Sequence, residues 1–413
     1  MGHILVEYFQ ELFTSSCPTV SEELLDAIHP KVTNRMNKVL LRDFRVAKVK
    51  KAFKQMHPLK ALGFDCMPPL FFQHYWPTVN YIVIQMVVDF LNHGVALPKF
   101  HETHIVLIPK TKNPSKVIDY RPINLCNMAY KLASKVVANR MKVVLKDIVC
   151  ENQRAFVAER LITNNVLVAH ELMNHIHRER KGKDGEMALK LDICKAYDRV
   201  EWGCLQNIME NLGFHERWIC IVMACVSSVT YAIRLNGQPC GLITLTRGLR
   251  QGDPLFPYLF LLCAEGLSAL LHKASVRKEL KGVAASTRGP RISHLFFADD
   301  SLIFCKATKK EGVEVQRILQ VYESSSGQQL NRNKTALFFS YNTPTHTQEV
   351  IKSMLGAKVI EPHESYLGLF SLIGKSKKNT FAQLKQKLPS KLAVWKEKLL
   401  SNVGKEVLIK VFA

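Results

Sequence analysis

Hydrophobic residues recur at two spacings along this chain, and the two spacings predict helices alternating with short strands. A period near 3.6 predicts helices, and short runs rich in β-branched and aromatic residues predict strands. The helical segments are Val39–Lys54, Leu70–Leu91, Met128–Val149, Leu161–Arg178 and Pro257–Ala274. The strand segments are Thr103–Pro109, Met187–Asp192, Tyr231–Leu235, Leu242–Leu245, Leu295–Phe297 and Leu302–Cys305. We therefore expect a chain of mixed α and β structure, long enough at 413 residues for two or three structural units.

Two of the strand pairs predict hairpins. Asn236-Gly237, a strong hairpin-turn signal, separates the first pair. The second pair surrounds Ala298-Asp299-Asp300-Ser301, so that two adjacent acids stand at the turn. Neighbouring carboxylates repel each other, and a divalent cation removes that penalty. The turn is either a solvated polar turn or a site for Mg²⁺, which prefers hard oxygen ligands.

A third acid favours the metal interpretation. Asp192 ends a predicted strand and precedes Asp299 by 299 − 192 = 107 residues. If the two strands are neighbours in one sheet, three carboxylates converge there. Two metal ions held by such a group activate a hydroxyl nucleophile and stabilise a leaving pyrophosphate. Taken alone, Asp192 has a strand-end cap as its alternative role.

The charge of the chain points to a polyanionic partner. Lysine and arginine number 57 against 35 acids, a net charge of +22. Phosphates neutralised by such side chains release counterions, so we expect nucleic acid as the partner. A membrane-surface protein and a merely basic soluble protein are the alternatives.

Cysteine spacing and the N-terminal sequence bear on zinc and on location. The 11 cysteines include no C-x-x-C pair, so we expect neither zinc nor a disulfide framework. No secretory signal is visible. The most apolar run, Leu255–Leu271, contains Pro257 and Glu265 and predicts a buried helix rather than a membrane span. We expect free thiols in a reducing compartment, and a protein that is not secreted and has no membrane partner.

A glycine loop precedes the last of the predicted long helices. Arg247-Gly248-Leu249-Arg250-Gln251-Gly252-Asp253-Pro254 enters that helix at Pro257. Glycine allows the backbone to approach a base pair or a phosphate closely. On its own such a basic loop is weak evidence.

In order along the chain, these three segments resemble motifs A, B and C of reverse transcriptases. Asp192–Asp198 resembles motif A, Arg250–Pro254 resembles motif B of non-LTR elements, and Phe297-Ala298-Asp299-Asp300 resembles the aromatic-x-Asp-Asp box. Four further segments resemble motifs that flank these in LINE-type enzymes of plants. They are Ala61-Leu62-Gly63 with Asp65, Tyr120–Leu125, Gly327–Asn331 with Lys334, and Tyr366-Leu367-Gly368. A single motif of this kind is weak evidence because it can arise by chance, whereas seven motifs in register are highly specific.

The resemblance implies roles for particular residues. Asp192 and Asp299 would bridge two Mg²⁺ ions, with Mn²⁺ as a substitute, and Asp300 would support the site. Tyr197 would exclude a ribose 2′-hydroxyl, with core packing as its alternative role. The implied nucleotide-binding residues are Lys110, Arg121, Tyr197, Gln251 and Gly252. The implied template- and primer-binding residues are Lys334, Tyr366 and Gly368.

The same resemblance implies a fold and a reaction. We expect an α+β right-hand polymerase: a helical extension over 1–60, helical fingers over 61–186, a palm with an antiparallel sheet over 187–370, and a partial thumb over 371–413. The reaction would be nucleotidyl transfer from a dNTP to the 3′-hydroxyl of a DNA primer on an RNA template, inside the cell, in the nucleus or cytoplasm. The alternatives are a catalytically inactive remnant that binds nucleic acid and a metal-dependent phosphoesterase.

Some positions depart from the family pattern. Phe64, Cys66, Arg154, Asn164 and Phe256 replace the usual residues, and Phe256 enlarges a position expected near the template path. None of these changes removes an implied metal ligand. We also expect this sequence to be a fragment of an element, without the endonuclease that usually precedes such polymerases and with a shortened thumb.

Overall fold

The computed structural model describes residues 2–59, 63, 65, 67–95, 102–286, 288–359, 365–367 and 369–370. The chain divides into two compact units, 1–359 and 360–413, and nearly all described residues belong to the first. The second unit contributes one two-stranded antiparallel sheet, β10 (Ser365–Tyr366) and β11 (Leu369–Phe370).

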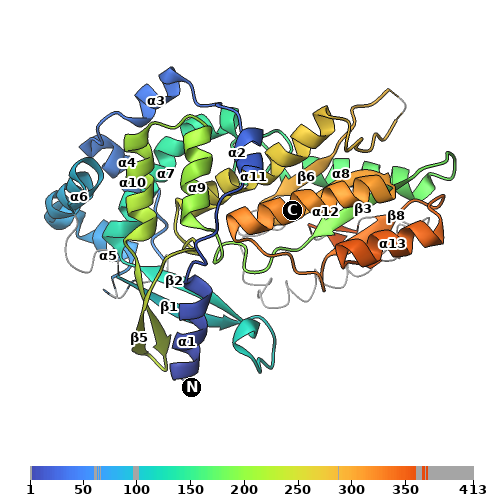
Figure 1. The fold of residues 1–413 in the computed structure, drawn as a ribbon. Coiled ribbons are helices and arrows are strands. Elements are labelled where there is room, and N and C mark those ends of the chain that lie inside the picture. Colours follow the sequence, from blue (N-terminus) through green and yellow to red (C-terminus); the bar gives the residue numbers. More distant parts are fainter. Residues whose placement is uncertain are drawn as a thin grey trace, which may run out of the picture. The chain divides into compact units, whose positions relative to one another are not determined.

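The described residues of the first unit form thirteen α-helices and nine strands (Figure 1). The helices are α1 (Gly2–Phe13), α2 (Glu22–Ala27), α3 (Asn34–Leu40), α4 (Val46–Lys54), α5 (Pro69–His74), α6 (Trp76–His93), α7 (Met128–Ile148), α8 (Ile162–Arg178), α9 (Trp202–Asn211), α10 (Glu216–Ser227), α11 (Phe256–Val276), α12 (Lys309–Ser326) and α13 (Thr345–Leu355). The strands are β1 (Glu102–Pro109), β2 (Tyr120–Cys126), β3 (Gly185–Leu191), β4 (Thr230–Leu235), β5 (Gln238–Thr244), β6 (His294–Phe297), β7 (Asp300–Ala307), β8 (Ala336–Phe339) and β9 (Lys358–Val359).

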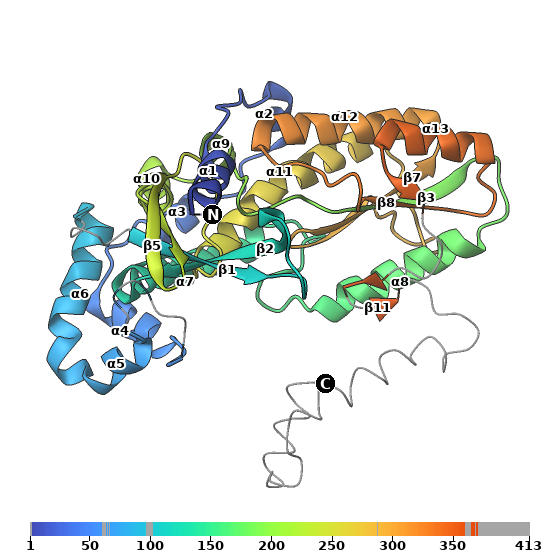
Figure 2. The ribbon, with the colours of Figure 1, turned by 90° about the horizontal axis from the view of Figure 1, so that it is seen from below.

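A five-stranded sheet with the order β6-β7-β3-β8-β9 forms one half of this unit. Helix α8 covers one of its faces, and α12 and α13 cover the other (Figure 2). The pairs from β6 to β8 are antiparallel as predicted, but β9 pairs with β8 in parallel. The sheet is therefore mixed, because α13 carries the chain back across the face before β9 begins.

A second, four-stranded sheet has the order β2-β1-β4-β5 and is also mixed. Its central pair, β1 and β4, is parallel, although the two strands lie far apart in the sequence. Helix α1 packs on β4 and β5, where the rings of Phe13 and Tyr231 meet edge to face at 5.2 Å. This sheet joins segments on both sides of the predicted boundary at residue 186.

Helix α11 is the central element of the core. It contacts α2, α7, α9 and α12, and most of its side chains are buried. Among the described residues it is the one helix long and apolar enough to cross a membrane, and 72% of its most apolar stretch is buried inside the protein. A buried core helix meets the same test of length and composition.

Two helices predicted as continuous are each interrupted. The segment Val39–Lys54 divides into α3 and α4, since the guanidinium of Arg140 binds the carbonyl oxygens of Leu40, Arg42 and Asp43 in the intervening turn. The segment Leu70–Leu91 divides into α5 and α6 at Tyr75. Pro77 lies in the first turn of α6, where its missing N–H costs nothing, and it disfavours continuation of the preceding helix.

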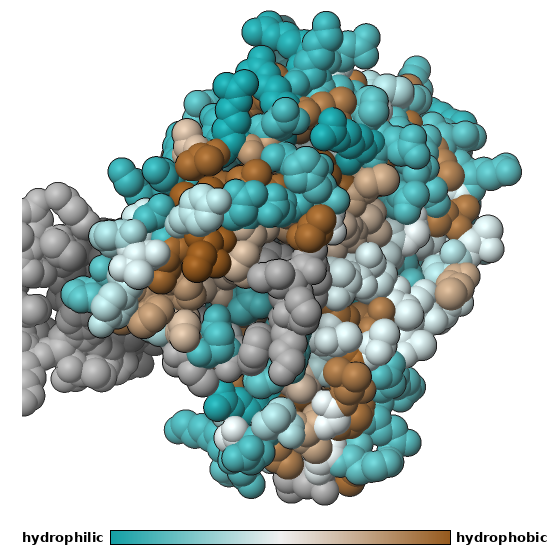
Figure 3. Space-filling view, turned by 90° about the vertical axis from the view of Figure 1, so that its left-hand side faces the viewer, coloured by the Kyte–Doolittle hydropathy of each residue, from teal (hydrophilic) through white to brown (hydrophobic). Residues whose placement is uncertain are grey.

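The face at the left of Figure 1, which carries α3, α4 and α6, is shown head-on in Figure 3. Hydrophilic side chains line its upper edge, at the height where α3 lies in Figure 1, and separate apolar patches lie below. The exposed apolar side chains of α6 include Tyr81 and Ile82. The upper edge of this face is therefore well hydrated.

Candidate active site

The three candidate acids lie at one end of the five-stranded sheet. In the ladder between β3 and β7, Leu191 pairs with Ser301. In the β6–β7 hairpin, Phe297 pairs with Asp300. Asp192 follows Leu191 and Asp300 precedes Ser301, so the register brings these two acids level with each other, with Asp299 in the turn. We call this group of three residues the acidic end.

The pleat also sets the direction of these side chains. Lys190 pairs with Leu302, and residues two positions apart along a strand share a face. Asp192 and Asp300 therefore project from the same face as Lys190. Burial, followed by the negative charge of Asp299, raises the pKa of Asp300; Asp192 adds to this effect and Lys190 opposes it. The acids are thus close enough to repel one another.

The donor set suits a hard divalent cation. Across the described residues, no three His, Cys, Asp or Glu side chains are gathered closely enough to hold a metal ion by themselves. Mg²⁺ commonly takes only one or two protein carboxylates and completes its shell with water and substrate phosphates. The mutual repulsion at Asp300 is what such a cation would relieve. The residues of the acidic end therefore fit divalent metal binding.

Buried neighbours hold the turn that carries Asp299. Ala298 has φ of 54°, a left-handed conformation that costs a non-glycine residue about 1–2 kcal/mol. Its N–H donates to Oε1 of Gln153 at 3.1 Å, and Gln153 is only 1% exposed. Asn165 donates to the carbonyl oxygen of Phe296 at 2.8 Å. The segment before α8 and the start of α8 thus fix the hairpin.

The loop after Asp192 is enclosed by two glycines from distant motifs. A Cβ at Gly248 would lie 2.7 Å from the carbonyl oxygen of Asp198, and one at Gly327 would lie 2.7 Å from that of Arg199. Both glycines have positive φ. Side chains are excluded at both positions, because the motif B and motif D segments close on the motif A backbone from different sides.

Hydrogen bonds complete this enclosure. The N–H groups of Gly248 and Leu249 donate to carbonyl oxygens of Val200 and Tyr197, each at 2.8 Å. Asn331 N–H donates to the carbonyl oxygen of Asp192 at 2.8 Å. The three motifs, which are spread between residues 192 and 331 of the sequence, therefore form one assembly around residues 192–200.

The two arginines of the motif B loop lie inside the protein. Arg247 pairs with Glu201 at 3.3 Å. Arg250 is 2% exposed, and its guanidinium lies 3.8 Å from the ring centroid of Tyr130. Neither arginine of this basic loop is therefore exposed for contact with a base pair or a phosphate. Gln251 and Gly252 remain at the surface side of the loop, where the Gln251 carbonyl accepts from Asn124 N–H at 3.3 Å.

Tyr197 lies between the core and the acidic end. Its ring stacks on Phe260 of α11 at 4.7 Å. Burial, with a further contribution from the negative charge of Asp299, raises the pKa of its hydroxyl. Tyr197 is half-buried. It therefore packs against the core and also lies close to the acidic end, so its two suggested roles are compatible.

Cationic side chains from three motifs gather beside the motif A loop. Burial lowers the pKa of Lys110, and the positive charges of Arg121 and Lys334 lower it further. Lys110, Arg121 and Lys334 are all exposed, and the Lys110 ammonium donates to the carbonyl oxygen of Ile118 at 3.0 Å. The effect of Arg121 and Lys334 on Lys110 shows that the three side chains lie near one another, and Asp198 of motif A also acts on Lys110. We call these three cations the basic group.

Two residues beside this group carried no role in the sequence interpretation. Lys195 has φ of 50° and a buried ammonium without a hydrogen-bond partner among the described residues. Asp198 is 1% exposed, and burial raises its pKa to about 6 against the influence of Lys195 and Lys110. The signal that could have identified these two residues is the presence of charged residues within an otherwise apolar motif. The sequence does not show, however, which of those charged residues are buried.

Some candidate residues lie partly or wholly outside the described part of the chain. Gly368 is outside it, as are residues 371–413 of the expected thumb; Tyr366 lies in β10 of the second unit, without a described side chain. In the upstream motif, Ala61 and Leu62 are likewise outside. Asp65 is described, and its Oδ2 accepts from Met128 N–H at 3.4 Å, at the start of α7.

Comparison with known proteins identifies the family. The profile of the family described as reverse transcriptase (RNA-dependent DNA polymerase) matches residues 108–370, which include the acidic end. An uncharacterized 149 kDa protein of transposon TX1 from Xenopus laevis is 25% identical over 413 residues, covering 97% of this chain and 30% of that protein. The Pol polyprotein of the type-1 retrotransposable element R2 from Popillia japonica is 26% identical over 198 residues, covering 48% of this chain and 26% of the polyprotein.

A shorter match comes from a plant. An uncharacterized mitochondrial protein of Arabidopsis thaliana is 57% identical over 67 residues, covering 16% of this chain and 55% of that protein. The chain thus spans about a third or less of the length of the TX1 and R2 proteins. With a family match over more than half of its residues and relatives among LINE-type, non-LTR retrotransposons, the chain belongs to the reverse transcriptase (RNA-dependent DNA polymerase) family.

Proposed function

We propose that this chain is an RNA-directed DNA polymerase that transfers a nucleotide from a dNTP to the 3′-hydroxyl of a DNA primer on an RNA template. The observation that carries the proposal is the register of β3 against β7, which brings Asp192 level with Asp300 beside Asp299. Two strands from motifs 107 residues apart thereby present three carboxylates at one sheet end.

Asp192 and Asp299 would hold two Mg²⁺ ions, or Mn²⁺ in their place, with Asp300 in support. Such ions supply Lewis-acid activation of the 3′-hydroxyl and charge stabilisation at the leaving pyrophosphate. The carboxylates keep the acidic end negative until a cation is bound. The stacking of Tyr197 on Phe260 fixes its ring close to Asp299, where it would exclude a 2′-hydroxyl.

The basic group would receive the triphosphate. Arg121 of β2 pairs with Ile108 of β1, and Lys110 directly follows Pro109, the last residue of β1. Charge-assisted contacts to phosphate suit both side chains. Gln251 and Gly252 would border the nascent base pair, and Lys334, Tyr366 and Gly368 would contact template or primer.

Domain organisation, origin and location complete the proposal. Residues 61–186, 187–370 and 371–413 would act as fingers, palm and the start of a thumb, after an extension over 1–60. The match to an Arabidopsis protein supports a plant element as the source. Copying of RNA into DNA would take place in the nucleus or cytoplasm.

Primer extension on an RNA template tests this function. The purified chain, with a DNA primer, dNTPs and Mg²⁺, should extend the primer, and Asp299→Asn should lose about a thousandfold or more of that rate, because metal-dependent charge stabilisation is worth several kcal/mol. The matched control is Asp184→Asn, an exposed acid before β3. Absence of extension by the wild-type chain, with RNA binding retained, would establish the inactive remnant instead. Nucleic-acid cleavage without added nucleotides would establish the phosphoesterase.

A further inference from the structure

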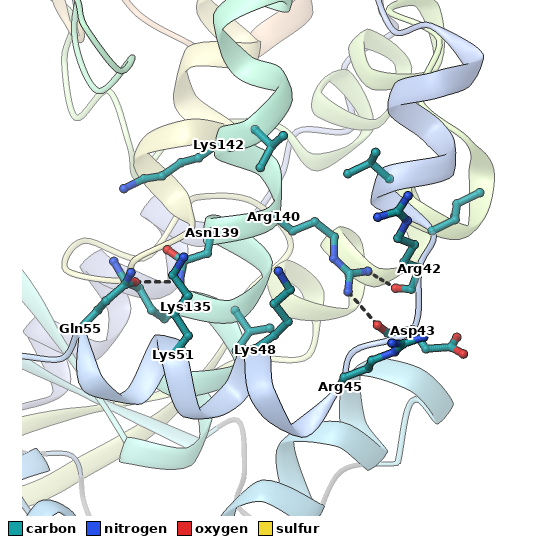
Figure 4. Close-up of a pocket in the computed structure, with 14 residues that line it drawn as sticks. Arg42, Asp43, Arg45, Lys48, Lys51, Gln55, Lys135, Asn139, Arg140 and Lys142 are labelled. Atoms are coloured by element: carbon teal, nitrogen blue, oxygen red, sulfur yellow. Dashed lines mark hydrogen bonds between the residues drawn. The ribbon is translucent and has the colours of Figure 1, made fainter.

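A cleft lined by basic side chains lies between α3, α4 and α7, away from the acidic end. Its volume is about 950 Å³. Figure 4 shows basic side chains of α4, of α7 and of the turn between α3 and α4 around the same space. We call it the basic cleft, after its lysines and arginines, which are Arg42, Arg45, Lys48, Lys51, Lys135, Arg140 and Lys142.

The charges that line the basic cleft are almost all of one sign. Asp43 is the one acid in its lining, and it already lies 3.9 Å from Arg217. Within the described part of the chain, no ion pair involves Arg42, Lys48 or Lys51. Packing does not require so many like charges around one space, whereas an anionic ligand would neutralise them.

One arginine builds the wall rather than the binding surface. The Arg140 guanidinium lies 3.3 Å from the ring centroid of Phe44 and binds carbonyl oxygens of the turn between α3 and α4. Burial lowers its pKa to about 10. Arg140 therefore fixes the turn that presents Arg42 and Arg45, and it is Arg42, Lys48 and Lys51 that form no ion pair with the described residues.

The positions of those cations follow the two helices. Lys48, Lys51 and Gln55 are spaced by three and four residues on α4, and Lys135, Asn139 and Lys142 are spaced by four and three on α7, so each set forms a stripe along one helix face. Asn139 donates to Oε1 of Gln55 at 2.8 Å, which joins the stripes at one point. Two basic stripes that meet at one point suit a chain of phosphates better than a single phosphate group.

The basic cleft continues toward the motif B loop. A neighbouring cavity of about 460 Å³ shares Gln55 and Lys135 with it and is also lined by Pro254 and Tyr258. Pro254 follows Gly252 by two residues, and the Lys142 ammonium lies 5.3 Å from the Tyr258 ring centroid. A nucleic-acid strand bound in the basic cleft would therefore lead to the loop that borders the proposed nascent base pair.

We propose that the basic cleft binds the phosphate backbone of single-stranded RNA. Lys48 and Lys51 of α4 and Lys142 of α7 contact phosphates from opposite sides. The lining holds no exposed aromatic side chain on which bases would stack, so recognition is independent of sequence. The choice of RNA rests on the proposed function, whereas binding itself requires no catalysis.

Salt-dependent binding of a labelled 20-nucleotide oligo(U) RNA to the full chain tests this site, without primer or dNTP. The variant Lys48→Gln/Lys51→Gln/Lys142→Gln should lower the slope of log affinity against log salt by about 2, at about 0.7 per phosphate contact on a single strand. The matched control is Lys183→Gln/Lys309→Gln/Lys310→Gln, which removes three charges from exposed positions elsewhere. Its slope should change by less than about 0.7.

Two further binding measurements test whether the basic cleft binds RNA or another anion. Sodium tripolyphosphate and phosphatidylserine vesicles are offered to the wild-type chain and to the cleft variant. The proposal is overturned if the cleft variant and the control keep the same RNA slope, or if the cleft variant loses only tripolyphosphate or vesicle binding. Asp299→Asn should keep the wild-type RNA slope even when extension is lost, so failure of catalysis and failure of this site are distinguishable.

Discussion

The acidic end and the basic cleft present their charges in opposite ways. The three acids lie on strand ends and in a turn, where backbone pairing fixes each position. The cations of the basic cleft lie on exposed helix faces and in a surface turn, at the ends of long flexible side chains. Carboxylates that share a cation bind it only if their positions are exact. The affinity of a stripe of lysines for an anion depends mainly on the number of charges. Conservative substitutions should therefore separate the two regions.

Among substitutions that conserve charge, the largest effect is expected from lengthening one acid. Asp192→Glu keeps the charge but moves the carboxylate outward by one methylene, and a misplacement of that order costs about 100-fold in rate. Steady-state primer extension measures it, and thermal unfolding checks that the fold is intact. If Asp192→Glu keeps half of the wild-type rate, positional precision does not govern the acidic end.

An effect of similar size, on stability rather than on rate, is expected where the backbone carries the geometry. Gly248→Ala places a Cβ 2.7 Å from the Asp198 carbonyl oxygen at a residue with φ of 97°. We expect a loss of about 3 kcal/mol in the free energy of unfolding, from strain and overpacking. The control is Gly203→Ala in α9, where no atom lies within 4 Å of the added Cβ. Equal stability of the two variants in urea unfolding would contradict the enclosure of the motif A loop.

The buried acid beside the motif A loop should make stability depend on pH. Because the pKa of Asp198 is about 6 in the folded state against 3.8 ordinarily, the folded chain keeps a proton between pH 4 and 6 that the unfolded chain loses. The free energy of unfolding should therefore fall as pH rises through this window, by at most about 3 kcal/mol, and level off above it.

Asp198→Asn removes this titration. The difference in unfolding free energy between variant and wild type should grow in favour of the variant from pH 4 to 6.5. Asp147→Asn, an exposed acid of α7, should show no such growth. Parallel curves for wild type and Asp198→Asn would mean that Asp198 is solvated or paired in the folded state.

The smallest effect is expected in the basic cleft. Lys48→Arg keeps the charge at an exposed position, so the affinity for oligo(U) RNA should change by less than about twofold, with an unchanged salt slope. A tenfold loss would show that the cleft depends on ammonium geometry as strictly as the acidic end depends on its carboxylates.

Much of the acidic end could be predicted because β-strands leave a short, local pattern of apolar residues in the sequence. Alternating apolar runs placed Asp192 at a strand end and Asp299 at a hairpin turn, and both strands form as expected. What the sequence could not supply was the pairing partner of each strand. The parallel pairing of β1 with β4 and the bonding of Asn331 to Asp192 depend on contacts between distant segments, which no local pattern encodes.

Burial was the other missing quantity. Arg250 read as part of a basic loop, yet it is enclosed by Tyr130 and Phe256. Phe256 seemed to intrude on a template path, yet it is 1% exposed in the hydrophobic core. The basic cleft was missed for the reverse reason. The lysines of α4 were visible in the sequence, but only folding shows that α7 brings a second set opposite them.

The packing of α1 has a consequence for synthesis on the ribosome. Gln10 of this first helix donates to the carbonyl oxygen of Thr244, 234 residues later. At translation rates of about 5–20 residues per second, that partner emerges roughly 10–50 seconds after the helix does. Throughout that interval the apolar face formed by Phe9 and Phe13 has no strand to cover it. The nascent chain therefore offers chaperones a defined early target, and messages that slow elongation between these two points would prolong its exposure.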